Sequence, residues 1–368
     1  MSLIKVKSRG TDSVTGTGKN VIINGEFAVA QRGTSFTNIG SGGGGTSGYD
    51  DVWTMDRFLI SQGQSAGRCS VVQSSDTPDG FSKSLKISTT TADTSIAAAE
   101  YHRLQTKFEG QDLQRFAKGT SGAKQYTLSF YCKANANATY VVELNDVDNA
   151  RSVSKTFSVT TNWTRVIVTF PADTTGAFDN DNNLSMELNW WMHTGSTYGG
   201  GTLQTTWASQ VQANRAVGID SIFDSTSRTF FITGVQLEVG DTASPFEHRS
   251  FGEELQSCYR YYRVVGPYGN PYQTNGLGYY LSHAGSGMQN NENRVAIPYF
   301  ETPFRSAPAI THVNYANGGT GALTEFSSGT VRSQTGAWDL SIHGGGYAQF
   351  NGNFANPIRY RAIFNAEL

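Results

Sequence analysis

Three kinds of structure meet in the stretch FFITGVQLEVGDTASPFEHRSFGEELQSCYRYYR, which spans residues 230–263. Apolar residues alternate in one phase over residues 230–232 and in the opposite phase over residues 235–239. A change of phase within one strand is typical of a β-bulge, and Gly234 lies where the phase changes. We therefore predict a long, bulged strand that ends a β-domain.

A short helix is predicted directly after this strand. Ser250 is followed three residues later by Glu253, which is the pattern of a capping box at a helix start. Large side chains then recur at helical spacing. This stripe consists of Phe251, Leu255, Tyr259 and Tyr262, with Cys258 at its edge. We expect the helix to cover residues 250–263, inside a linker of residues 249–265 that separates two β-domains.

The part of the chain before this helix has the pattern of a β-sandwich. Apolar residues alternate with polar ones over residues 126–132, 140–144, 166–170 and 184–192. Such strands present one apolar face, as antiparallel sheets packed on one side do. We predict a mainly β protein with an antiparallel jelly-roll β-sandwich over residues 21–248. Its first strand is expected at residues 21–27, beside a last strand at residues 229–239, and one helix is expected at residues 97–116.

The remaining segments are interpreted from their composition. Residues 266–368 are rich in glycine and in short apolar runs, so we expect a C-terminal β-domain with a thin core. Its closing strand is predicted at residues 359–364. Residues 1–20 are basic and rich in Gly, Ser and Thr, which indicates either a frayed terminus or an arm that docks onto a larger particle. The glycine tract of residues 40–48 predicts a flexible loop.

Composition excludes several classes of protein. The formal net charge of -2 gives no electrostatic basis for nucleic-acid binding. No apolar run approaches the roughly 20 residues that span a membrane. The N-terminal residues lack the apolar core of a signal peptide, so we expect synthesis in a cytoplasm. The three cysteines, Cys69, Cys132 and Cys258, fit neither a disulfide framework nor a zinc site, and we expect them to be reduced and packed.

The candidate catalytic and metal motifs are incomplete. Residues 63–67, GQSAG, match the nucleophile-elbow pattern, but a strand is predicted where that motif needs a helix. Residues 179–183 begin like a calcium loop, but Leu184 stands where an EF-hand requires glycine. An acidic turn is therefore predicted there, with a structural Ca²⁺ ion as the alternative. No pair of catalytic carboxylates stands out, so we expect no enzymatic activity and no cofactor.

Aromatic residues provide a candidate binding surface. Trp190 and Trp191 are neighbours on one strand, so their rings point to opposite faces of the sheet. If Trp190 is in the core, Trp191 faces outward, near Tyr198 and Trp207 in the sequence. Exposed aromatic rings stack on the C–H faces of sugars, which makes these three residues glycan-contact candidates. The alternative is that Trp191 packs against another subunit or a covering loop.

Four segments resemble those of a known family. They are KNVIINGEFAVAQRGTS (residues 19–35), VWTMDRF (52–58), GVQLEVGDTASPFEHRSFGEELQSCYRYY (234–262) and YRAIFNAEL (360–368). These segments resemble the ends and the central joint of tail-fibre-like virion proteins of bacteriophages. The first and last predicted strands are also similar to those of jelly-roll carbohydrate-binding modules.

The resemblance implies a structural virion component, made in the host cytoplasm, that forms a tail fibre or fibre-like appendage and contacts host surface glycans. The residue 1–20 arm would bind other virion proteins. A capsid-decoration or tail-tip protein without a receptor role is the alternative, and a polysaccharide depolymerase is a third hypothesis. The apolar stripe of the predicted helix and the unpaired strand edges of the C-terminal domain must both be buried against another surface. A homotrimer, which is typical of the family, would bury both.

Overall fold

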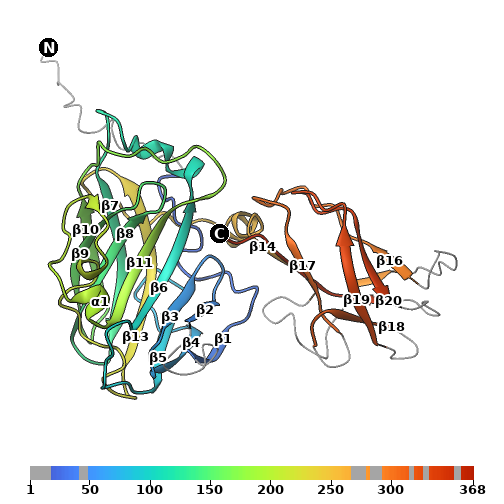
Figure 1. Cartoon of the computed structure of the whole chain (residues 1–368), viewed down its shortest axis with the longest axis horizontal. Helices are drawn as coiled ribbons and strands as arrows, with labels where there is room; N and C mark the ends of the chain where they lie inside the picture. The colour runs from blue at the N-terminus through green and yellow to red at the C-terminus, as the bar shows by residue number, and fades with distance from the viewer. Residues whose placement is uncertain are drawn as a thin grey trace, which may run out of the picture.

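The computed structural model describes residues 18–40, 49–266, 279–281, 292–314, 319–325, 331–351 and 358–368 of the 368-residue chain. A large N-terminal β-sandwich and a smaller C-terminal β-lobe meet at one short helix (Figure 1). The predicted mainly β, antiparallel architecture is confirmed. Residues 1–17 of the expected arm and residues 41–48 of the expected loop lie outside the described residues. In the part of the chain that is described, no helix has the length and apolarity needed to cross a membrane.

Two antiparallel sheets form the sandwich, in the jelly-roll arrangement that was predicted. The first sheet has the order β1 (Ser35–Ile39), β4 (Arg68–Ser74), β5 (Ser84–Thr91), β13 (Thr229–Val239), β7 (Tyr126–Ala134) and β10 (Thr164–Phe170). The second has the order β12 (Ala208–Ser209), β9 (Arg151–Val159), β8 (Ala138–Asp146), β11 (Leu184–Thr194), β6 (Tyr101–Glu109), β3 (Leu59–Gly63) and β2 (Tyr49–Trp53). The four alternating segments of the sequence are β7, β8, β10 and β11.

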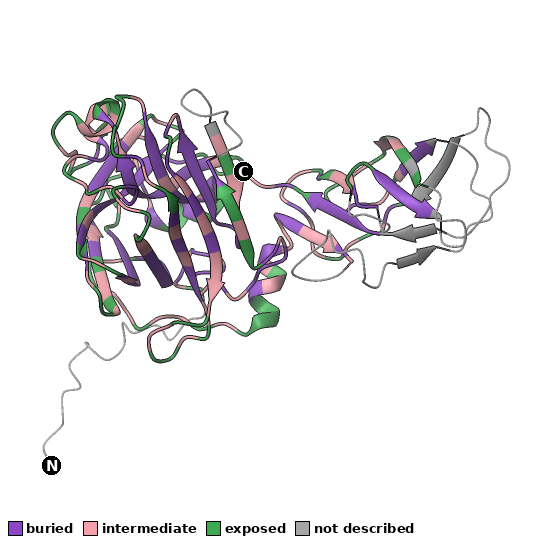
Figure 2. Cartoon of the chain, turned by 90° about the horizontal axis from the view of Figure 1, so that it is seen from below, coloured by how far each residue is buried: buried purple, intermediate pink, exposed green. Residues whose placement is uncertain are grey.

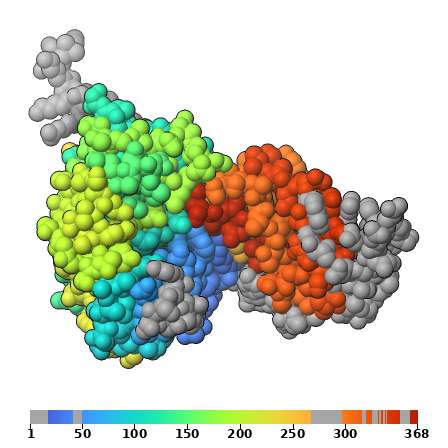
Figure 3. Space-filling view, viewed as in Figure 1, coloured from blue at the N-terminus to red at the C-terminus, as the bar shows by residue number. Residues whose placement is uncertain are grey.

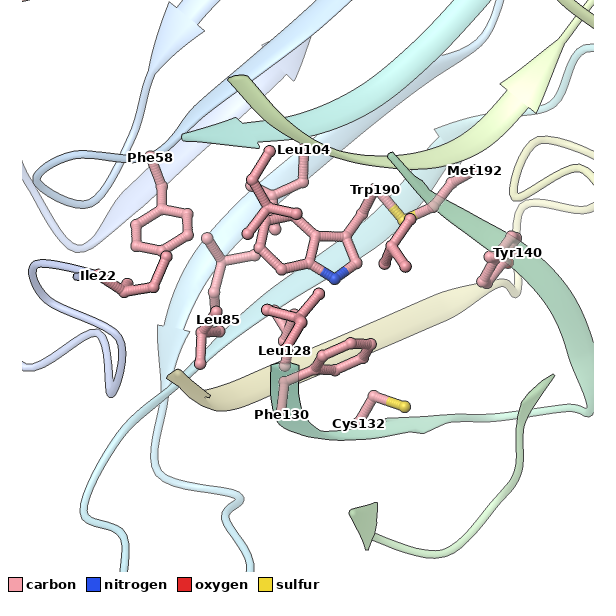
Figure 4. Packing of buried hydrophobic residues seen from close by; sticks show 14 of the residues in the cluster. Ile22, Phe58, Leu85, Leu104, Leu128, Phe130, Cys132, Tyr140, Trp190 and Met192 are labelled. Atoms are coloured by element: carbon pink, nitrogen blue, oxygen red, sulfur yellow. The ribbon is translucent and has the colours of Figure 1, made fainter. Parts of the chain in front are cut away.

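The core lies between these sheets and is centred on Trp190. Its indole is fully buried and lies among Leu104, Leu128 and Phe130, which come from both sheets (Figure 4). The Phe130 ring meets it edge-on, with centroids 5.9 Å apart. All three cysteines are free and buried, as predicted, and burial raises the pKa of the Cys132 thiol to about 12.

Residues 21–27 do not form the predicted first strand, although they lie beside β13 as predicted. Residues 21–27 form turns, with positive φ at Asn24 (61°) and Phe27 (57°). This segment still lies beside β13, because the Val235 amide donates to the Gly25 carbonyl at 2.9 Å. The pairing falls at the predicted bulge, where the register of β13 shifts and Gly234 adopts a φ of 62°. The bulge turns the strand away from regular pairing, so the neighbouring segment cannot continue as a strand.

The predicted helix at residues 97–116 is also wrong. The segment forms strand β6 and a 3-10 helix, Gly110–Phe116. Leu104 and Phe108 face the core from alternate positions of β6, and this period of two decides the structure over the helical spacing.

The helix at the joint is shorter than predicted. Helix α2 covers Phe251–Cys258, and the predicted capping box is present: the Ser250 amide donates to Glu253 Oε2 at 2.8 Å, and the Glu253 amide donates to Ser250 Oγ. The helix ends before Tyr262 because that residue starts strand β14 (Tyr262–Val265), which pairs with β22 (Ala362–Asn365). Figure 2 shows the exposed first turn of α2 between the two lobes.

The C-terminal lobe contains two smaller sheets. One has the order β14, β22 and β17 (Ala309–His312). The other has the order β15 (Tyr279–Leu281), β21 (Ile358–Tyr360), β18 (Ala322–Glu325), β19 (Val331–Trp338), β20 (Tyr347–Asn351) and β16 (Glu292–Ala296). The predicted closing strand is therefore divided between β21 and β22. The buried cluster of this lobe, which includes Phe304, Leu323, Phe350 and Phe364, is much smaller than that of the sandwich.

Candidate ligand-binding face of the second sheet

The second sheet turns one side away from the core, and that side is polar. Leu104 and Trp190 are paired across β6 and β11 and face the core. Their neighbours along each strand therefore face outward. The register aligns these outward residues in rows across the sheet. One row is Asp51, Ser61, Arg103 and Trp191; the next is Trp53, Leu59, Gln105, Asn189 and Glu143; the third is Lys107, Glu187 and Asn145.

Some of these side chains are accessible, and we call this set the outer face. It consists of Asp51, Trp53, Arg103, Lys107 and Glu187, together with Gln210 from the segment that follows β12. In Figure 3 the teal surface of β6 lies between the yellow-green segment around residue 200 and the red C-terminal residues. The outer face is therefore bordered on both sides by other parts of the same chain.

Buried amides hold the outer face in place. Gln105 Nε2 donates to Asn189 Oδ1 at 2.7 Å, across two adjacent strands. Asn145 Nδ2 donates to Glu187 Oε2 at 3.0 Å, and Gln210 Nε2 donates to Asn145 Oδ1 at 2.5 Å. Side chains fixed by such bonds on paired strands lose little further freedom when a ligand binds.

Opposite charges are interleaved on this face. Burial alone would raise the pKa of Glu187, but the charge of Arg103 and the hydrogen bond from Asn145 leave it below its usual value. The carboxylate is therefore ionised at neutral pH. Burial lowers the pKa of Lys107, against the opposing effect of Glu187, and its ammonium donates to the Leu368 carbonyl at 2.9 Å. The face thus offers fixed donors and acceptors beside the indole of Trp53.

A segment of the sandwich covers the other half of this side of the sheet. It contains α1 (Ser196–Gly199) and a 3-10 turn, Gln212–Asn214. Beneath it, Arg215 donates to both carboxylate oxygens of Glu143, at 2.7 and 2.9 Å, and the Trp191 indole N–H donates to the same carboxylate at 2.9 Å. The Arg215 guanidinium also lies 4.9 Å from the Trp191 ring centroid.

The three predicted glycan contacts do not form a surface. Trp191 is on the outward side of the sheet, as expected, but only 1% of it is exposed, because the covering segment lies on it. Tyr198 belongs to that cover and lies 5.5 Å from the Trp191 ring. Trp207 is buried in the main core, and its indole N–H donates to the Pro171 carbonyl. The prediction is therefore wrong for Trp191 and Trp207, and the alternative of a covering loop describes Trp191.

The predicted oligomer contacts are also only partly accessible. Cys258 and Tyr262 are buried inside the chain itself, so neither can contribute to a subunit interface. Phe251 is 49% exposed, and Leu255 and Tyr259 are half-buried.

Among the described residues, one group of potential metal ligands comes together: Asp93, Glu100 and His193, with ligand atoms within 4.8 Å of one another. Internal hydrogen bonds already engage this group. Asp93 accepts from the Ser65 hydroxyl, and His193 contacts Glu100 at 3.2 Å. Burial and the charge of Asp93 raise the pKa of Glu100, whereas burial lowers that of His193 to about 4. Burial alone would raise the pKa of Asp93, but hydrogen bonds from Ser65 and the Ala66 amide leave it below its usual value, so the group holds an ionised carboxylate beside a neutral His193.

The acidic turn of residues 179–183, which was considered as a calcium site, is also engaged in internal hydrogen bonds. Asp181 accepts from the Asn183 amide at 2.9 Å, and Asp148 accepts from the Asp179 amide at 3.0 Å. These bonds are typical of side chains that stabilise a turn.

Sequence reasoning missed the outer face because its two cations, Arg103 and Lys107, lie in the segment predicted as a helix. The pattern that could have revealed it is the alternation of apolar Leu104 and Phe108 with long polar side chains at 103, 105 and 107.

No protein-family model and no curated protein matches this chain. Among solved structures, a family 4 carbohydrate-binding module (CBM4) is similar at 13% identity and a TM-score of 0.30, covering 59% of this chain and 97% of that one. The enzymatically active domain of bacteriophage CBA120 tailspike protein 4 is similar at 14% identity and a TM-score of 0.31, covering 60% and 21%. A family 11 carbohydrate-binding module from Clostridium thermocellum is similar at 9% identity and a TM-score of 0.28, covering 55% and 99%. At these scores the likeness assigns neither a ligand nor a role to this chain.

Proposed function

We propose that this chain is a non-catalytic, glycan-binding component of a bacteriophage virion, and that the outer face is its glycan-binding surface. The observation that supports this most is the composition of that face: two carboxylates, two cations and an indole on paired strands, with the carboxamide of Gln210 beside them. Sugar hydroxyls both donate and accept hydrogen bonds, so they match such a mixture, and the indole offers a surface for the C–H face of a ring.

The virion role rests on the resemblance of residues 19–35, 234–262 and 360–368 to tail-fibre-like proteins. We propose a homotrimeric fibre or fibre-like appendage whose N-terminal arm attaches to other virion proteins. An exposed Phe251 beside a half-buried Leu255 supports association through α2, because water-exposed apolar side chains gain from being covered.

Binding to host surface polysaccharide tests the glycan proposal. We expect Glu187→Ala and Arg103→Ala each to weaken binding at least tenfold, because each removes a fixed polar group of the outer face. Lys86→Ala is the control, since Lys86 lies on the first sheet over Phe231 and far from this face. Equal binding by all variants would contradict the proposal, and release of new reducing ends would favour the depolymerase hypothesis.

Sedimentation and particle assembly test the structural role. The full chain should sediment as a trimer, and Phe251→Asp should shift it toward monomer because three charges would face one another near the axis. A folded monomer of the unaltered chain at micromolar concentration would contradict the trimer.

Deletion of residues 1–18 should leave folding intact but prevent incorporation into particles.

A further inference from the structure

A pocket lies beside the joint helix α2, on the side of the C-terminal lobe, and shares no residue with the outer face. Its volume is about 400 Å³, and we call it the joint pocket. Helix α2 and strand β14 form one wall, and the loop that follows β16 forms the other. The residues that matter for its chemistry are Gln256, Tyr259, Arg263, Tyr299, Phe300 and Glu301. A pocket of this size is within the range of small-ligand sites.

Arg263 is the most unusual group of the joint pocket. Its guanidinium lies between two aromatic rings, 3.9 Å from the Tyr259 centroid and 4.3 Å from the Phe300 centroid. These ring contacts restrict the guanidinium, and Arg263 as a whole is half-buried and lines the pocket. Partial burial lowers the pKa of Arg263, against a smaller opposing effect of Tyr259.

Three other arginines near the joint have carboxylate partners, and Arg263 does not. Arg260 pairs with Glu109 at 2.6 Å, Arg249 with Glu254 at 3.0 Å, and Arg32 with Glu367 at 3.0 Å. Within the described part of the chain, no carboxylate oxygen lies within 4.0 Å of an Arg263 nitrogen. A held, partly desolvated cation without a counter-ion favours an anion from outside the chain.

The opposite wall provides a flat surface. Tyr299 is 69% exposed, and its ring is stacked on His343 with centroids 5.0 Å apart and planes 11° from parallel. This stacking holds one face of the tyrosine ring and leaves the other accessible. Glu301 and the Gln256 amide, which donates to the Thr302 hydroxyl, add polar groups at the rim.

We propose that the joint pocket binds an acidic sugar residue, with its carboxylate on Arg263 and its ring on Tyr299. A planar carboxylate matches the two parallel donors of a guanidinium edge. Glu301 adds one negative charge to the wall, which favours a singly charged carboxylate over a doubly charged phosphate. A neutral sugar would leave Arg263 unpaired, so the site selects for charge. This site is separate from the outer face and does not depend on it.

Calorimetry with the full chain tests the proposal, using a glucuronate-containing oligosaccharide and its carboxyl-reduced form. We expect the acidic form to bind at least tenfold more tightly, and added salt to weaken only that form. A sialylated oligosaccharide as a third ligand distinguishes the two sources of a sugar carboxylate. Equal affinity for the acidic and reduced forms, or binding of neither acidic ligand, would overturn the proposal.

Two variants locate the binding. Arg263→Gln should remove the preference for the acidic form. Tyr299→Ala should weaken binding of both forms, because it removes the stacking surface; Tyr299 is 69% exposed, so the substitution leaves no buried cavity. Arg228→Gln, on the sandwich surface beside Asp224, is the matched control and should bind as the unaltered chain does. Glu187→Ala on the outer face should also leave this binding unchanged, which separates failure here from failure of the proposed function. Full affinity and selectivity in Arg263→Gln would overturn the assignment.

Discussion

At the scale of single residues, buried histidines make the stability of this chain depend on pH. Burial lowers the pKa of His102 to about 3, with a further contribution from His193, and lowers those of His193 and His312 to about 4. The unfolded chain takes up these protons near the ordinary value of about 6.5, and the folded chain does not. Stability from these groups is therefore present above about pH 6.5 and is lost as the pH falls toward 4. Glu100, whose pKa is raised, acts in the opposite direction.

We predict that His102→Gln reduces this dependence on pH. The variant keeps a polar group beside Gln62, whose Oε1 accepts from His102 Nδ1 at 2.9 Å, but it cannot titrate. The loss of unfolding free energy between pH 6.5 and pH 4 should be smaller than in the unaltered chain by on the order of 3 kcal/mol. Denaturant unfolding at a series of pH values measures it. Identical pH profiles would show that His102 is not neutral in the folded chain.

Arg215 and Glu143 form a buried ion pair beneath the segment that carries α1. Arg215→Met should destabilise the chain by about 3–5 kcal/mol, because it leaves the carboxylate of Glu143 buried without its cation. The double variant Arg215→Met, Glu143→Gln should recover most of that loss, since no charge then remains in the site. Denaturant unfolding of both proteins measures the difference. A loss below about 1 kcal/mol in the single variant would mean that Glu143 is not confined as the structure has it.

At the scale of elements, the close contact between residues 21–27 and β13 determines how the sandwich is closed. A Cβ atom on Gly25 would lie 2.2 Å from the carbonyl oxygen of Val235, which is backbone and cannot turn aside. We therefore predict that Gly25→Ala destabilises the chain by about 2 kcal/mol or more, through strain at this contact. Gly252→Ala is the control. That glycine lies in the first turn of α2 with nothing within 4 Å, so alanine should leave stability unchanged or raise it by up to about 1 kcal/mol. Thermal unfolding compares the two, and equal effects would contradict the predicted contact.

Elements that bury one face were predictable, and elements shaped by distant partners were not. The alternation in β7, β8, β10 and β11 reports burial directly, and the capping box at Ser250 is a local pattern. Residues 21–27 look like a strand, yet their structure depends on the bulge of β13, which lies more than 200 residues away in the sequence. The joint pocket joins Arg263 to Tyr299, and no local pattern relates those positions. Trp191 was placed on the correct side of its sheet, but its cover is a loop whose course has no sequence period.

At the scale of the whole molecule, charged contacts fasten the C-terminal residues to the sandwich. The Glu367 carboxylate pairs with Arg57 and, at 3.0 Å, with Arg32, and all three side chains are nearly buried. Arg305 extends the contact by donating to the Ala366 carbonyl at 2.7 Å and to the Asn182 carbonyl at 2.9 Å. The two lobes are thus held by buried polar contacts in addition to the covalent link through α2.

Removing the charge of Glu367 should therefore loosen one lobe from the other. We predict that Glu367→Gln costs about 3–5 kcal/mol, because Arg32 and Arg57 would remain buried without their shared carboxylate. The loss should appear as two separate thermal transitions in place of one, since the sandwich has a large core of its own and the C-terminal lobe has a small one. Calorimetry shows the transitions, and limited proteolysis should locate the newly accessible sites near residues 259–266. Asp224→Gln, which breaks the exposed pair with Arg228, is the control and should cost less than about 1 kcal/mol. A single, unshifted transition in Glu367→Gln would show that α2 and β14 alone hold the lobes together.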